Sequence, residues 1–251
     1  MTVDTAARTR LRTEVLIVLG LSLGQSAVYS VVQLAEKMTR GPLGQATSTL
    51  NQPQSTREYF DLMYQLLGIF FALVPVALVF FLLASGGVNG FRKFGFTFER
   101  PGSDSLRGLG LAALIGIPSL GLYAVGRALG ITTSIIPSAL DAYWWTVPVL
   151  ILSAVRHGIV EEVIVVAYLL DRLPRFGLRM PAVILVSALL RGSYHLYQGF
   201  GPFVGNAVMG VVFAWVYTRT RRVMPLVIAH ALLDIVAFVG FSLFGKAIGL
   251  G

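Results

Sequence analysis

Long apolar runs, separated by short polar segments, make up most of this chain. A membrane helix needs about 20 mostly apolar residues, and several stretches meet that requirement. They cover residues 12–35, 60–84, 105–129, 143–170, 180–197, 202–218 and 225–245. A further re-entrant or broken element around 130–150 would bring the number to eight. The pattern therefore predicts an all-α fold: a polytopic membrane helical bundle of seven to eight transmembrane helices.

The polar segments between these runs differ in positive charge. With the N-terminus in the cytoplasm, thirteen of the 20 Lys and Arg residues fall on the inner side and five on the outer side. Cytoplasmic loops of membrane proteins carry an excess of Lys and Arg. We therefore expect a cytoplasmic N-terminus. No linker or low-complexity stretch divides the chain, so residues 1–251 are expected to form a single membrane-embedded domain.

The amino-acid composition is typical of a protein embedded in the lipid bilayer. Apolar residue types make up 55% of the chain and charged types 13%, roughly half the usual charged share of a soluble domain. The net charge of +8 does not indicate nucleic acid as a partner, because the Lys and Arg residues sit between apolar spans rather than on one water-facing patch. Cysteine is absent, which excludes disulfides and thiolate chemistry.

Eight ionisable residues nevertheless fall inside the fourth, fifth and seventh predicted spans. They are Arg156, His157, Glu161, Glu162, Arg191, His195, His230 and Asp234. Each costs an estimated few kcal/mol at the bilayer centre unless it is paired or hydrated, so the group marks a functional site by default. Six of them form pairs four residues apart, which places each pair on one helix face: 157 with 161, 191 with 195, and 230 with 234.

A wet cavity enclosed by these faces would suit attack by an activated water on an amide. A carboxylate and a histidine can share the proton of that water, and His230 could donate a hydrogen bond to the oxyanion that forms. Asp234 could do so only if protonated. The sequence contains neither GxSxG nor HExxH, so serine and zincin-type chemistry have no support.

The same residues resemble the CAAX prenyl protease and bacteriocin-processing (CPBP) family, also called the abortive-infection family. Its motifs are EExxxR, FxxxH and HxxxN or HxxxD, in that order, on separate transmembrane helices. The corresponding segments here are Glu161 to Val166, Arg191 to His195, and His230 to Asp234. The resemblance covers roughly residues 143–245, which we expect to be the catalytic core.

The resemblance implies an intramembrane endopeptidase that cleaves membrane-anchored or membrane-embedded proteins and peptides near their C-termini. It also implies that Glu161 and His195 activate the water and that His230 and Asp234 stabilise the oxyanion. A bacterial plasma membrane is the expected location. This family has been described both as metalloproteases and as metal-independent glutamate proteases. Zinc and no cofactor therefore both stay open, and any metal would have Glu161, His195 and His230 as candidate ligands.

Two positions depart from the family motifs. Residue 166 is Val where the motif has Arg, and residue 191 is Arg where the motif has Phe. Glu162 loses the partner that the usual arginine would provide, so we expect Arg191 to supply the missing charge from the next span. His157 has no counterpart in the motifs. It could orient Glu161 or serve as a metal ligand, although a histidine that only packs between helices is the simpler interpretation.

Two other classes of function stay open. Buried Glu, His and Asp residues also relay ions in transporters and proton-coupled channels, but the sequence shows no inverted halves. A non-catalytic member of the family, acting as a bacteriocin immunity protein, is the third possibility, and the missing arginine at Val166 is the best argument for it.

Overall fold

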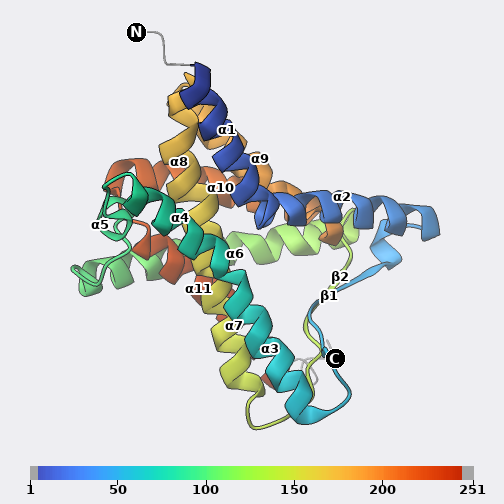
Figure 1. The fold of residues 1–251 in the computed structure, drawn as a ribbon. Helices are drawn as coiled ribbons and strands as arrows, with labels where there is room; N and C mark the ends of the chain where they lie inside the picture. Colours follow the sequence, from blue (N-terminus) through green and yellow to red (C-terminus); the bar gives the residue numbers. More distant parts are fainter. Residues whose placement is uncertain (1–4, 245–251) are drawn as a thin grey trace.

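Helices make up almost the whole described chain, which is residues 5–244 of the computed structural model (Figure 1). The α-helices are α1 Thr5–Gly20, α2 Leu23–Arg40, α3 Glu58–Ala72, α4 Val74–Ser85, α5 Gly90–Phe94, α6 Pro101–Ala128, α7 Thr146–Glu161, α8 Leu169–Arg172, α9 Met180–Ser193, α10 Phe200–Thr220 and α11 Met224–Phe244. A π-helical segment, Glu162–Tyr168, joins α7 to α8. The other elements are 3-10 turns at Leu43–Gln45, Leu173–Phe176 and Leu196–Gln198, and strands β1 Thr47–Asn51 and β2 Ser134–Ser138.

Every predicted span coincides with helix, but fewer of the helices qualify as membrane spans. By length and apolar composition four of them do: Glu58–Ser85, Pro101–Ala128, Phe200–Thr220 and Met224–Leu243. A fifth results if the bent pair α1 and α2 counts as one. The long helices, with mostly outward-facing apolar surface, are those of an integral membrane protein, and the fold is almost all-α as predicted.

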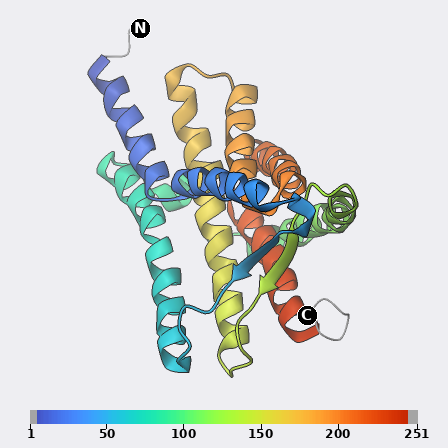
Figure 2. The same ribbon diagram turned by 90° about the vertical axis from the view of Figure 1, so that its right-hand side faces the viewer.

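The first predicted span, 12–35, is not one straight helix. The chain bends by 56° between α1 and α2, and the hydroxyl of Ser22 at this point donates to the carbonyl oxygen of Val18 at 2.6 Å. Glycine and serine together are a common cause of sharp helix kinks, and Gly20 precedes Ser22 here. As a result α2 runs across the other helices rather than along them (Figure 2).

A two-stranded sheet replaces the membrane element that we expected around 130–150. Strands β1 and β2 pair in parallel, with Thr47 opposite Ser134 and Asn51 opposite Ser138. Parallel strands need a long crossover connection, and here the whole of α3 to α6 lies between them. The β-branched residues of both strands favour this extended conformation, and β1 lies between the first two predicted spans.

The centre of the fold is the continuous rod formed by α7, the π-helical segment and α8. All seven residues of the π-helical segment are buried, and α11 packs against both α7 and α6. A π-helix displaces carbonyl groups from the regular ladder, and the hydroxyl of Ser187 on α9 donates to the carbonyl of Val165 at 2.6 Å. Short π-helical segments occur frequently at functional sites.

Close packing of α7 against α11 depends on Gly158. A Cβ atom at this position would lie 2.9 Å from the carbonyl oxygen of Val227 and 3.3 Å from the amide nitrogen of Ala231. We therefore expect Gly158→Ala to lower the free energy of unfolding by about 1–3 kcal/mol, because two backbones must move apart. Thermal unfolding of the purified protein in detergent would measure this. Gly110→Ala is the matched control, since nothing lies within 4 Å of a Cβ there.

Candidate active site

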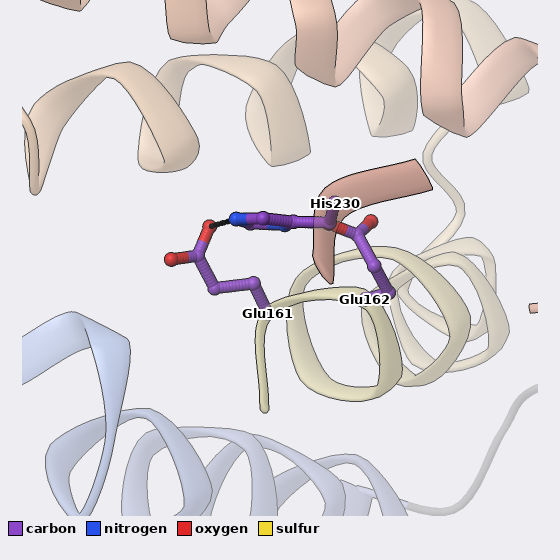
Figure 3. A group of neighbouring side chains, drawn as sticks. All are labelled: Glu161, Glu162 and His230. Atoms are coloured by element: carbon purple, nitrogen blue, oxygen red, sulfur yellow. Dashed lines mark hydrogen bonds and ion pairs between the residues drawn. The ribbon is translucent and has the colours of Figure 1, made fainter. Parts of the chain in front are cut away.

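Two adjacent glutamates occupy the point where α7 passes into the π-helical segment, and His230 of α11 lies beside them (Figure 3). Arg191, from the last turn of α9, completes the group. All four are buried. The structure therefore brings together residues from the three spans that the sequence singled out.

Glu162 is fully enclosed and is held by two donors. Its Oε1 atom accepts hydrogen bonds from Nη2 of Arg191 at 2.6 Å and from Nδ1 of His230 at 2.6 Å. Arg191 is itself 0% exposed. Arg191 thus contacts Glu162 across the helix interface, and its replacement of the motif arginine stays a prediction. Glu162 thus fixes the orientation of the imidazole and neutralises a buried cation.

Glu161 has a different environment from its neighbour. Its Oε2 atom accepts a hydrogen bond from the hydroxyl of Tyr194 at 2.6 Å and lies 3.5 Å from Nη1 of Arg191. The Nε2 atom of His230 lies 3.9 Å from the same oxygen. Glu161 retains 6% of its exposure, against 0% for Glu162. Of the two carboxylates, Glu161 is the less completely enclosed.

His195 does not lie on the same helix as Arg191. Helix α9 ends at Ser193, and His195 follows in the turn that leads to the segment Leu196–Gln198. The predicted pair at 191 and 195 on one helix face is therefore wrong, because the helix ends before the second residue. Nε2 of His195 is buried without a hydrogen-bond partner among the described residues. An unsatisfied buried nitrogen of this kind often marks the place of a bound water or substrate.

The third pair, His230 and Asp234, does share one face of α11, with Nε2 and Oδ2 separated by 3.9 Å. His157 also reaches this carboxylate: its Nδ1 atom lies 3.1 Å from Oδ2 of Asp234. The suggestion that His157 orients Glu161 is not supported by a contact, since in the structure it contacts Asp234. Arg156 contacts Ser153 instead of a glutamate.

Comparison with known families locates these residues within one domain. Residues 143–236 match the family model described as Type II CAAX prenyl endopeptidase Rce1-like. This part of the chain is therefore similar to the CAAX protease family. The Rce1-like domain contains every residue of the buried group, and the match bears out the resemblance seen in the three sequence motifs. Comparisons with curated proteins and with solved structures found no match.

Three side chains of the Rce1-like domain carry metal-binding atoms close together. One atom each of Glu161, Glu162 and His230 lies within 4.8 Å of the others. The predicted ligand His195 is not in this group, and Glu162 takes its place. The donors fit a divalent cation poorly, because Arg191 already neutralises Glu162 and a second cation beside its guanidinium would be repelled. Binding would also require Glu162 to give up two 2.6 Å hydrogen bonds.

Tyr194 is a site residue whose role the sequence left open between packing and lining a cavity. Its hydroxyl donates to the accessible carboxylate, so Tyr194→Phe should slow turnover by roughly tenfold, since a hydrogen bond to a charged group contributes about 1.5–3 kcal/mol. Rates on a cleaved peptide would test this. Tyr217→Phe is the matched control, because Tyr217 is also buried but lies on α10 and forms no hydrogen bond with Glu161. An equal loss in both variants would contradict the assigned role of Tyr194.

Proposed function

We propose that the protein is an intramembrane endopeptidase that hydrolyses peptide bonds of membrane-associated proteins or peptides without a metal ion. One observation carries this proposal: two adjacent glutamates of a CAAX-protease-like domain have unlike environments, Glu162 being fully enclosed by Arg191 and His230 while Glu161 is still 6% exposed. A pair of acids held in different environments is typical of sites where one reacts and the other positions.

In the proposed mechanism Glu161 is the general base. A water held between Glu161 and Nε2 of His195 loses a proton to the carboxylate while its oxygen attacks the carbonyl carbon of the substrate. The carbon–nitrogen bond then breaks as the leaving nitrogen takes up the proton from Glu161. Water and the peptide bond are consumed, a carboxylic acid and an amine are released, and Glu161 returns to its starting state.

Stabilisation of the oxyanion is assigned to His230. Its Nδ1 hydrogen bond to Glu162 leaves Nε2 directed to the side of Glu161 and Asp234, and as an imidazolium it donates from both nitrogens. Asp234 can donate only when protonated, and His157 is the nearest group to its Oδ2 atom. We therefore assign the main stabilisation of the oxyanion to His230. Asp234 and His157 lie next to it and have a supporting role.

A membrane-anchored or membrane-embedded substrate fits a site buried among apolar helices, since it can arrive through the bilayer. Four expectations stay predictions: the count of seven to eight spans, the cytoplasmic N-terminus, the bacterial plasma membrane, and the extent of the catalytic core over residues 143–245. An ion-relay function is disfavoured by Arg191, because a fixed buried cation next to the glutamates would oppose cation passage. The non-catalytic immunity function loses its main argument, since Arg191 occupies the place of the missing arginine.

The proposal is tested by reconstituting the protein in neutral-lipid vesicles with a library of N-terminally lipidated peptides and detecting products by mass spectrometry. We expect cleavage at one defined peptide bond, with the same rate before and after treatment with EDTA and phenanthroline. His195→Ala should remove the activity. A library without a single cleaved peptide would contradict the peptidase function, and activity lost to chelators and restored by zinc would contradict the metal-free mechanism.

A further inference from the structure

A polar groove of about 620 Å³ lies between α2, β1 and the segment that follows α9. Its volume is within the range of ligand-binding pockets in general. Tyr194 connects the groove to the proposed site: it forms part of the groove wall, and its hydroxyl reaches Glu161, which does not itself line the groove.

One wall of this groove is an open strand. Thr47, Ser48 and Thr49 of β1 line it, and within the described chain β1 pairs only with β2. Figure 2 shows β1 leaving the end of α2 with β2 on one side of it. The outer edge of a strand offers backbone donors and acceptors to an extended peptide. This wall therefore fits the main chain of a peptide better than it fits an acyl chain.

Lys37 of α2 gives the groove a cation without a described counter-ion. Its Nζ atom donates to Oγ of Ser48 at 2.5 Å and to the carbonyl oxygen of Tyr197 at 2.7 Å. Both acceptors are neutral, and the ammonium has a third donor. The neighbouring cation Arg40 differs, since it forms an ion pair with Glu36. Lys37 is half-buried, so its charge is only partly compensated by water.

We propose that this groove binds the substrate peptide in an extended conformation and that Lys37 binds a carboxylate carried by that peptide. The inference rests on the proposed peptidase function, because it places the carboxylate on one side of a bond held at Glu161. A charged partner for Lys37 adds a charge-assisted hydrogen bond and fixes the register of the peptide along β1. Lys37 is then the residue that decides which peptide bond reaches the site.

A binding experiment tests the proposal without requiring cleavage. The protein carrying Glu161→Gln is placed in nanodiscs of neutral lipid, and fluorescence anisotropy follows a short apolar peptide labelled at its N-terminus. The peptide is made with a C-terminal carboxylate, with a C-terminal amide, and as an amide with glutamate as its last residue. We expect a carboxylate form to bind roughly tenfold more tightly than the plain amide, and the tighter of the two acids identifies which carboxylate Lys37 takes.

Variants of two cations, one inside the groove and one outside it, complete the test. Lys37→Met should bind all three peptides equally weakly, whereas Lys37→Arg should keep most of the preference. Arg57→Gln, the control, should keep it fully because Arg57 is an exposed cation that does not line the groove. Equal binding of acid and amide with Lys37 present, or a preference that survives Lys37→Met, would overturn the proposal. Loss of the preference when phosphatidylglycerol is added would assign Lys37 to a lipid headgroup and also overturn it.

The outcome separates this inference from the proposed function. A preference for the carboxylate that depends on Lys37, in a protein that cleaves no peptide, would establish a peptide-binding groove and remove the peptidase function. Cleavage that depends on Glu161 but is equally fast for acid and amide peptides, in wild type and Lys37→Met alike, would keep the peptidase function and remove the role of Lys37.

Discussion

Arg191→Phe is expected to destabilise the protein by about 3–5 kcal/mol and to abolish activity. The substitution restores the residue of the family motif, yet it leaves Glu162 as a buried charge without its cation, and breaking a buried pair by removing one partner costs about that much. The guanidinium also lies 5.5 Å from the ring of Phe213 and 3.5 Å from Glu161, and both contacts are lost. Thermal unfolding and peptide cleavage measure the two effects.

A second substitution shows whether activity needs an arginine at position 191 or only an arginine near Glu162. Val166→Arg, added to Arg191→Phe, places an arginine at the motif position four residues after Glu162. We expect partial recovery of activity in the double variant, limited by the cost of a large side chain at a position that is 0% exposed. Arg175→Phe, which removes a half-exposed cation outside the site, is the control for the substitution itself. Full activity of Arg191→Phe alone would refute the hypothesis that Arg191 replaces the motif arginine as the partner of Glu162.

Glu161→Gln should lower the turnover rate by roughly a thousandfold, the middle of the range for loss of a general base. The amide keeps the size of the side chain and can still accept from Tyr194, so the fold should be retained. Glu162→Gln should have a different effect: it removes the nearer of the two counter-ions of buried Arg191 and should lower the unfolding temperature together with the activity. Glu99→Gln, at an exposed carboxylate, is the control. A Glu161→Gln protein that cleaves at half the wild-type rate would remove Glu161 from the mechanism.

The buried group could be predicted from the sequence because ionisable residues are rare in apolar spans. Burying each one costs free energy unless it has a partner, so a cluster of them stands out. Spacing then placed Glu161 one turn from His157 and His230 one turn from Asp234, since both pairs lie within regular helices. The partner of Glu162 was also predictable, because the missing arginine at Val166 and the added one at Arg191 compensate each other.

Features that depend on tertiary contacts could not be predicted in the same way. Nothing in the periodicity ends α9 at Ser193, and the end of that helix is what removes His195 from the face of Arg191. The contact between His157 and Asp234 joins residues on two helices, so spacing along one helix gives no information about it. The choice of Tyr194 as the donor to Glu161 depends on the same helix end.

The front half of the chain was the least predictable part. Residues 36–58 fall between two predicted spans and were given no role, whereas in the structure they contain β1 and part of the groove wall. The pairing of β1 with β2 joins segments separated by α3 to α6, and such non-local pairing leaves no local signal. The sequence likewise indicated no role for Lys37, which was one of the five Lys and Arg residues assigned to the outer side.

The most direct test of the central claim is a comparison of new C-termini in a membrane proteome. Purified wild-type protein, Glu161→Ala and His195→Ala are each incubated with the same membrane extract, and peptides with new C-termini are identified by mass spectrometry. The proposed mechanism predicts a set of cleavage sites in membrane-associated proteins that appears with the wild type and is missing with both variants. No wild-type-specific cleavage, or the same sites in the Glu161→Ala sample, would contradict it.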